Sequence, residues 1–186
     1  MDRTTYYKFR STQNFKYLID ILVNQRLYAS TYKNLNDAME GIYIANGLKP
    51  SKLKSIKEGK ELIKICSLST DKEHPLLWGH YADGSRGICI GLKITGHNLD
   101  KKQIIYDGIP EIRKVIDDKK TVKEILTHKD SSWEYEKELR IFTEKDYVKI
   151  HISEIIFGSR ISVNEKKLIQ KIVCKFCPDA ILSEQK

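Results

Sequence analysis

Residues 133–142 read WEYEKELRIF and combine charged side chains with an apolar strand pattern. From Glu138 to Ile141 charged and apolar side chains alternate, which is typical of a β-strand with one buried face. The pattern therefore predicts a strand over residues 138–142.

Similar apolar patterns predict further strands on both sides of this segment. These strands cover residues 5–9, 27–31, 62–69, 87–94, 103–107 and 154–158. Helices are predicted after Ser11, near 51–60, over 74–82 and 110–127, and after Ser162. Ser11 can cap its helix, and Ser162 can form a capping box with Glu165. Many strands with few helices between them, in irregular order, favour an α+β fold with a mixed or antiparallel central sheet flanked by helices. We expect a single domain over residues 1–186.

Composition and charge narrow the classes of protein. The chain is 40% apolar and 31% charged, as in a globular domain. No apolar run approaches the roughly 20 residues that span a bilayer, and the first ten residues lack a signal-peptide core. We therefore predict a cytoplasmic protein without membrane contact. The net charge of +8 favours an anionic partner, a nucleotide or nucleic acid, although a solvated lysine-rich surface explains it equally well.

The four cysteines do not form a metal-binding pattern. Cys66 and Cys89 lie in apolar runs and are predicted to be core residues. Cys174 and Cys177 form one CxxC, but a structural zinc site needs four ligands and no second ligand pair follows. We predict four reduced cysteines and no bound metal.

Three charged or aromatic groups are candidates for a binding site. Strand alternation places Lys8 and Arg10 on one face, and Tyr28 and Ser30 on one face of the next strand. Two neighbouring cations suit an anion or a carboxylate between them. His80 lies in the short helix predicted over 74–82, either facing the core or acting as a general base or ligand contact.

The carboxylates of 133–142 form the fourth group. Alternation would place Glu134, Glu136, Glu138 and Arg140 on one face of a strand. This face is either a functional site or a structural charge cluster on an edge strand. In the structural alternative, Lys8, Arg10 or Arg140 neutralises the carboxylates.

Four segments in order resemble the bacterial family catalogued as "domain of unknown function 2971". They are YKFR (7–10), LYASTYKNLNDAMEG (27–41), LWGHYADGSRGICIGL (77–92) and KDSSWEYEKELR (129–140). Each motif alone is weak, whereas all of them in this order and spacing are specific. Ala38, Arg86 and Leu139 depart from the family pattern, which often has proline, a His-Lys pair and tryptophan there.

The strand order is also similar, more distantly, to that of the ADP-ribosyltransferase superfamily. This similarity implies NAD as a substrate, with Lys8 or Arg10 on its pyrophosphate and ribose. It implies Tyr28 stacked on the nicotinamide and Glu138, or else Glu136, on the ribose 2′-hydroxyl. A carboxylate there would stabilise an oxocarbenium-like transition state.

Three functional hypotheses follow. The first is an NAD-dependent ADP-ribosyltransferase-like enzyme, a toxin or phage-defence effector, with Glu138, Glu136 and His80 as catalytic residues. Its cofactor-binding residues are Lys8, Arg10, Tyr28, Ser30 and Arg140. The alternative is a non-catalytic nucleic-acid- or nucleotide-binding module. A metal-dependent nuclease built on Glu40, His80 and the carboxylates of the 133–142 segment ranks last, because no metal-ligand spacing is recognisable.

Overall fold

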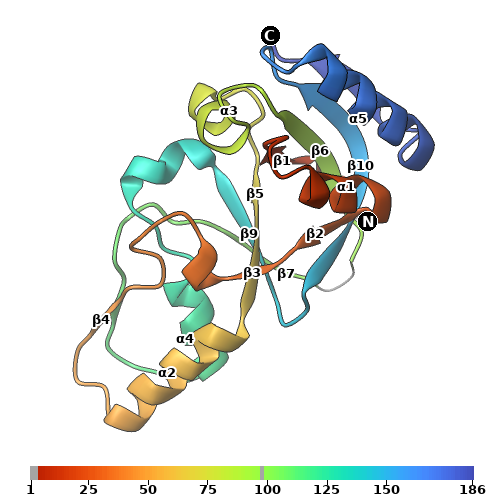
Figure 1. Ribbon diagram of the computed structural model, residues 1–186. Helices are drawn as coiled ribbons and strands as arrows, with labels where there is room; N and C mark the ends of the chain where they lie inside the picture. Colours follow the sequence, from red (N-terminus) through yellow and green to blue (C-terminus); the bar gives the residue numbers. More distant parts are fainter. Residues whose placement is uncertain (1–3, 97–98) are drawn as a thin grey trace. The chain divides into compact units, whose positions relative to one another are not determined.

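The computed structural model describes residues 4–96 and 99–186, and the chain divides into two compact units (Figure 1). The first unit comprises Met1–Leu27, Leu68–Asn98 and Tyr147–Lys186, and the second comprises Tyr28–Ser67 and Leu99–Asp146. Helices and mostly antiparallel strands make up both units, which confirms the α+β prediction. The prediction of one domain over 1–186 stays a prediction.

The first unit is built on a sheet with the strand order β11-β10-β6-β1. Its strands are β1 (Tyr6–Arg10), β6 (Ile88–Ile94), β10 (Tyr147–Phe157) and β11 (Ile181–Glu184). Neighbouring strands are antiparallel except β10 and β11, which are parallel. The helices are α1 (Phe15–Asn24), α3 (Pro75–Tyr81) and α5 (Val163–Phe176). Strand β11 follows the last predicted strand and was missed, because its Ile181 and Leu182 are exposed and lack an alternating pattern.

Helix starts in the first unit follow local hydrogen bonding. The capping box is confirmed, since the Ser162 hydroxyl accepts a bond from the Glu165 amide at 3.3 Å. The prediction for Ser11 is wrong. Helix α1 starts after Asn14, and the Ser11 hydroxyl instead accepts a bond from the Gln13 amide within the preceding turn.

The second unit combines two helices with strands that pair mostly in the antiparallel direction, β4 and β8 being parallel. Its strands and helices are β3 (Ser30–Thr31), β4 (Ile44–Ala45), β5 (Lys64–Ser69), β7 (Asp100–Gln103), β8 (Glu111–Ile112), β9 (Glu138–Thr143), α2 (Pro50–Leu62) and α4 (Asp118–Ile125). Strand β5 continues into the first unit, where Ser69 pairs with Tyr7 of β1, and β2 (Arg26–Tyr28) pairs with β10. The second unit also contains two 3-10 helices, η1 (Tyr32–Asn34) and η2 (Ser131–Glu136).

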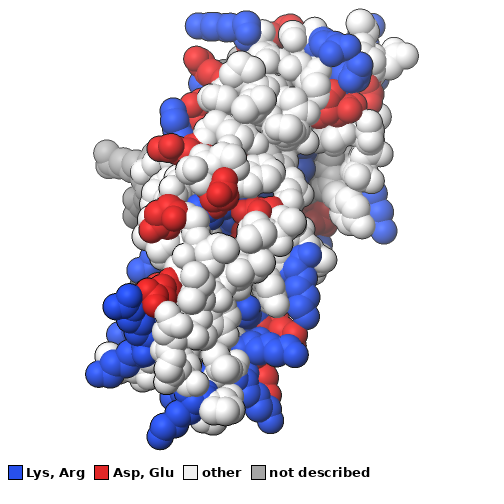
Figure 2. All heavy atoms as spheres, turned by 90° about the vertical axis from the view of Figure 1, so that its left-hand side faces the viewer, with Lys and Arg blue, Asp and Glu red and all other residues white. Residues whose placement is uncertain are grey.

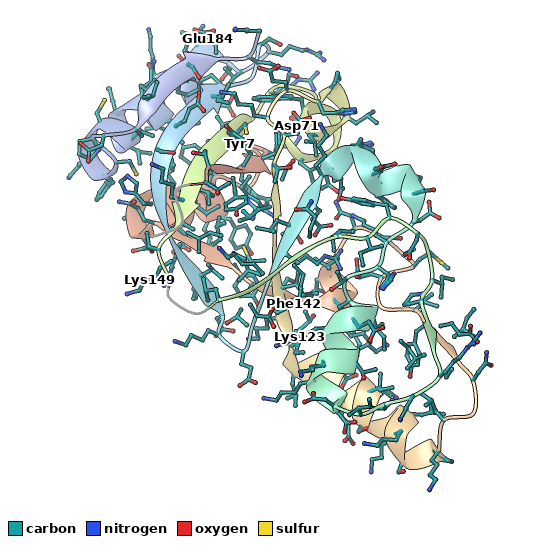
Figure 3. The ribbon with its side chains drawn as sticks, turned by 180° about the vertical axis from the view of Figure 1, so that it is seen from behind. Tyr7, Asp71, Lys123, Phe142, Lys149 and Glu184 are labelled. Carbon is teal, nitrogen blue, oxygen red and sulfur yellow. The ribbon has the colours of Figure 1, made fainter. Side chains whose placement is uncertain are left out.

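The core of this unit joins α2 and α4 to β5, β8 and β9. It contains Ile56, Ile63, Ile65, Ile112, Val122, Ile125, Leu126 and Phe142. Figure 3 labels Phe142 on β9 and Lys123 on α4; Lys123 bonds Asp100 at 2.6 Å. The strand predicted over 138–142 is confirmed as β9.

The strand predicted over 154–158 is only the end of β10, which begins at Tyr147, and three other predicted elements differ from the structure. The strand over 27–31 is interrupted at Ala29, whose amide bonds the carbonyl of Asp146 instead of a neighbouring strand. The strand over 103–107 lies earlier, as β7. The helix over 110–127 is reduced to α4, because β8 pairs in parallel with β4 just before it. In all three cases a partner distant in sequence decides the local conformation.

No helix among residues 4–96 and 99–186 is both long and apolar enough to cross a membrane.

Candidate functional site

Five charged side chains form a buried ionic cluster in the second unit. They are Glu40, Lys129, Glu136, Glu138 and Arg140, and none is more than 8% exposed. Buried charges are rare unless they are paired. The cluster is therefore the most unusual chemical feature of this unit.

A change of backbone conformation at Lys137 brings two carboxylates of the 133–142 segment, those of Glu136 and Glu138, to the same lysine. Helix η2 ends at Glu136, Lys137 adopts a left-handed conformation with φ of 43°, and β9 begins at Glu138. The prediction that Glu134 and Glu136 share a strand face with Glu138 is therefore wrong, and Glu134 is exposed. Glu138 and Arg140 do lie on one face of β9, as strand alternation requires.

The alternative that this segment is an edge strand is also wrong. Strand β9 lies between β5 and β7 in the sheet order. Its charged side chains, Glu138 and Arg140, are also buried, and a buried charge needs a partner.

Arg140 occupies the centre of the cluster and uses all of its donors. Its two Nη atoms bond the two carboxylate oxygens of Glu40 at 2.6 and 2.7 Å. Its Nε and Nη2 bond Glu138 at 2.9 and 3.2 Å, and Nη1 also bonds the carbonyl of Leu126 at 2.6 Å. Because a guanidinium has five N–H groups, this geometry leaves none for a ligand.

Lys129 closes the other side of the cluster. Its Nζ bonds Glu136 and, at 3.3 Å, Glu138, and it lies 4.5 Å from the ring centroid of Trp133. The hydroxyl of Tyr106 accepts a bond from the Glu138 amide at 2.7 Å. Both the backbone and the carboxylate of Glu138 are thus fixed.

The cluster shifts the pKa values of Glu138 and Glu40 in opposite directions. Burial alone would raise the pKa of Glu138, but Arg140 and Lys129 lower it to about 2. Burial raises the pKa of Glu40 despite its bond to Arg140. Burial would lower the pKa of Arg140, yet Glu138 and Glu40 raise it. Glu138 and Arg140 are therefore both charged at neutral pH.

This geometry suits a structural role in which buried ion pairs hold separate segments of the second unit together. Glu40 belongs to the loop that follows η1, so its bonds to Arg140 tie that loop to β9. A catalytic carboxylate must touch the reacting atoms, whereas the side chain of Glu138 is only 5% exposed. Contact with a substrate would require the cluster to open.

The structure divides the predicted site residues between the two units. Glu136, Glu138 and Arg140 meet in the second unit, and Tyr28 and Ser30 belong to the same unit. Tyr28 is 54% exposed, and Ser30 is half-buried on β3, where it pairs with Ile65 of β5.

Lys8, Arg10 and His80 belong to the first unit. Lys8 and Arg10 are half-buried on β1, and their register opposite Ile90 and Ile88 of β6 confirms that they share a face. His80 is exposed on α3, so the alternative in which it faces the core is wrong.

Lys129 and Tyr106 were missed by the sequence reasoning. Lys129 begins the family-like motif over 129–140, but a lysine is almost always exposed, and nothing in the local sequence marks Lys129 as buried. Glu40 did carry a signal, because it lies in the family-like motif over 27–41 and was a candidate in the nuclease hypothesis.

A second polar group lies on the sheet of the first unit. Lys72 Nζ bonds both carboxylate oxygens of Glu154 at 3.3 Å, and the Ser183 hydroxyl donates to Glu154 at 3.2 Å. Lys72 also lies 5.7 Å from the ring centroid of Tyr7, which Figure 3 labels together with Asp71. These bonds attach β11 and the segment after β5 to the sheet.

No group of three or more His, Cys, Asp or Glu side chains arranged for a metal ion occurs within residues 4–96 and 99–186. Cys66, Cys89 and Cys177 are buried, and Cys174 is exposed on α5. Burial raises the pKa of Cys89 and Cys177, and the Cys177 thiol bonds the carbonyl of Leu22 at 3.2 Å.

We expect thiol reactivity to follow this burial, because the thiolate is the reactive form. With Ellman's reagent, one thiol of the native protein should react fast, and Cys174→Ser should abolish that phase. The unreduced, denatured chain should release four equivalents. A lower number would reveal a disulfide, and stoichiometric zinc in metal analysis would contradict the prediction of unliganded cysteines.

Comparison with protein-family models, curated proteins and solved structures finds no match to this chain. The resemblance to the "domain of unknown function 2971" family and to ADP-ribosyltransferases therefore stays a prediction.

Proposed function

We propose that the protein is a nucleic-acid-binding module and that the first unit binds the phosphate backbone through α5. The observation that carries this proposal is a row of exposed lysines on that helix. Lys167, Lys171 and Lys175 are spaced by four residues and are all exposed, opposite the buried Ile169 and Val173. Four residues of helix rise about 6 Å, so the row presents three cations over about 12 Å.

These lysines differ from paired basic residues, such as Lys52 and Lys119, in lacking acidic partners. Across the described ranges, no carboxylate forms an ion pair with Lys167, Lys171 or Lys175. Their neighbour Lys166 is paired with Glu184 of β11, which Figure 3 labels. Exposed cations without an acidic partner are available to neutralise the phosphates of a nucleic-acid backbone.

The distribution of charge between the two units also favours the first unit, which contains α5, as the one that binds an anionic partner. The first unit holds 15 of the 33 Lys and Arg and 9 of the 25 Asp and Glu, so it carries +6 of the net +8. On the face shown in Figure 2, basic and acidic side chains are both present. Several lysines of the second unit are paired, such as Lys52 with Asp118 and Lys119 with Glu144.

The proposal assigns the buried cluster to folding and leaves no role for it in ligand contact. The saturated donors of Arg140 support this assignment. The activity on NAD remains a separate prediction, tested through Glu138 below.

Neutralising the three lysines of α5 is expected to weaken the binding of nucleic acid and to make that binding less dependent on salt. The triple variant Lys167→Gln/Lys171→Gln/Lys175→Gln should reduce the slope of log K against log salt by about 2 for a single strand, because each phosphate contact contributes about 0.7. Fluorescence anisotropy with a labelled 20-mer at several salt concentrations measures the slope.

The matched control Lys57→Gln/Lys114→Gln/Lys120→Gln removes the same charge from exposed positions of the second unit. It should leave the slope nearly unchanged. Equal losses in both variants would show that net charge alone attracts the strand. Wild-type protein that binds neither the oligonucleotide nor heparin at low salt would refute the proposal, and binding only to anionic lipid vesicles would identify a membrane surface instead.

A further inference from the structure

The turn between α3 and β6 has an unusual backbone. Asp83, Gly84 and Ser85 all have positive φ, at 52°, 59° and 66°. Residues other than glycine rarely adopt this conformation, so the surrounding structure must hold it.

A second turn, after β10, fixes this loop. The Gly158 amide bonds the carbonyl of Gly87 at 3.0 Å, and the Arg160 amide bonds the carbonyl of Ser85 at 2.9 Å. A methyl group on Gly158 would lie 2.2 Å from the Ser85 carbonyl oxygen, so only glycine permits this approach. The two turns therefore form one rigid support.

Two arginines converge on this support. Arg86 Nη1 bonds the carbonyl of Asp83 at 3.2 Å, and Arg160 Nη1 reaches the carbonyl of Gly84 at 3.5 Å. A methyl group on Gly84 would lie 3.5 Å from Nη1 of Arg86 and 3.7 Å from Nη1 of Arg160. Both guanidinium groups thus lie over Gly84, and both arginines are exposed.

The charge at this place is not balanced. The carboxylate of Asp83 lies 4.0 Å from Arg86. In the part of the chain that the structure describes, no carboxylate pairs with Arg160. Two like charges held side by side repel each other unless an anion lies between them.

The remaining donors are those of the arginines. The amides of Gly84, Ser85 and Gly87 already bond the carbonyls of α3 and its C-cap. The first turn of α5 is already capped by Ser162 and Glu165. Any anion at this place would therefore be held by guanidinium groups, which bind phosphate in a bidentate manner.

We propose that Arg86 and Arg160 bind a terminal phosphate of the nucleic acid whose backbone follows the lysine row of α5. Arg160 precedes the cap of α5, Ser162, by two residues, so the arginine pair lies at the start of that helix. A terminal monoester carries up to two negative charges near neutral pH, as phosphoserine does, and matches two guanidinium groups better than an internal diester. This inference rests on the proposed function.

Oligonucleotides of one sequence with a 5′-phosphate, a 3′-phosphate or no terminal phosphate test it by fluorescence anisotropy. Wild-type protein should bind one phosphorylated form about tenfold more tightly, the value of one charge-assisted hydrogen bond of about 1.4 kcal/mol. Arg86→Gln/Arg160→Gln should lose this preference and still bind the unphosphorylated strand. The matched control Arg113→Gln/Lys114→Gln, in the second unit, should keep it.

The outcomes separate the two proposals. Equal affinity of wild-type protein for all three strands overturns the phosphate site and leaves the proposed function intact. If no strand binds, the proposed function fails, and pyrophosphate then tests the arginine pair alone by thermal shift. Stabilisation of wild-type protein but not of Arg86→Gln/Arg160→Gln supports the site, and no stabilisation overturns it.

Discussion

Arg140→Met is expected to lower the free energy of unfolding by about 3–5 kcal/mol, the cost of breaking a buried ion pair. Arg140 is 1% exposed, and its loss leaves the carboxylates of Glu40 and Glu138 buried beside each other. For a chain of this length the midpoint of thermal unfolding should fall by about 10 °C. Urea and thermal unfolding at pH 7 measure the change.

Two further variants test whether the loss of stability comes from the buried ion pairs of Arg140. Arg113→Met removes an exposed arginine that bonds Glu111 at 2.8 Å, and it should change stability by no more than about 0.5 kcal/mol. Adding Glu40→Leu to Arg140→Met removes one of the two buried carboxylates that have lost their arginine partner. The double variant should therefore recover part of the lost free energy of unfolding. An Arg140→Met protein as stable as the wild type would show that the cluster does not support the fold.

Glu138→Gln is expected to destabilise the protein at neutral pH and to flatten its acid sensitivity. The pKa of Glu138 is lowered from 4.5 to about 2, so the folded protein binds this proton less readily than the unfolded chain. Its contribution to stability is therefore present above about pH 4.5 and is lost as the pH falls toward 2. A difference of this size corresponds to about 3 kcal/mol.

Glu40 should act in the opposite direction. Burial raises its pKa, so its ionisation costs stability as the pH rises through the unfolded value. Melting temperatures of wild type, Glu138→Gln, Glu40→Gln and the exposed control Glu144→Gln between pH 2.5 and 7 test these signs. If Glu138→Gln melts like the wild type at pH 7, the carboxylate has no structural role.

The same variant tests the enzyme hypothesis. Nicotinamide release from NAD by wild-type protein, lost in a fully stable Glu138→Gln variant by roughly a hundredfold, would indicate a catalytic carboxylate. An absence of release in the presence of nucleic acid or lysate, together with a destabilised variant, would leave only the structural role.

The elements that the sequence determined are those fixed by neighbours within a few residues. Alternation from Glu138 to Ile141 is sufficient for β9, because successive side chains of a strand face opposite sides. The Ser162 and Glu165 pair is sufficient for the start of α5, because both partners of the capping box lie within one turn. The pattern around Lys8 and Arg10 likewise fixed their shared face on β1.

The tertiary structure decided everything that depends on distant partners. Glu40 and Arg140 are 100 positions apart, and only the folded chain shows that they bond. The left-handed Lys137 removes Glu136 from β9, and a single such residue leaves no trace in a strand pattern. Arg86 and Arg160 converge because two separate turns bond each other. Local sequence sets which conformation each segment prefers, whereas burial and long-range hydrogen bonds decide which charges face each other and which remain in solvent.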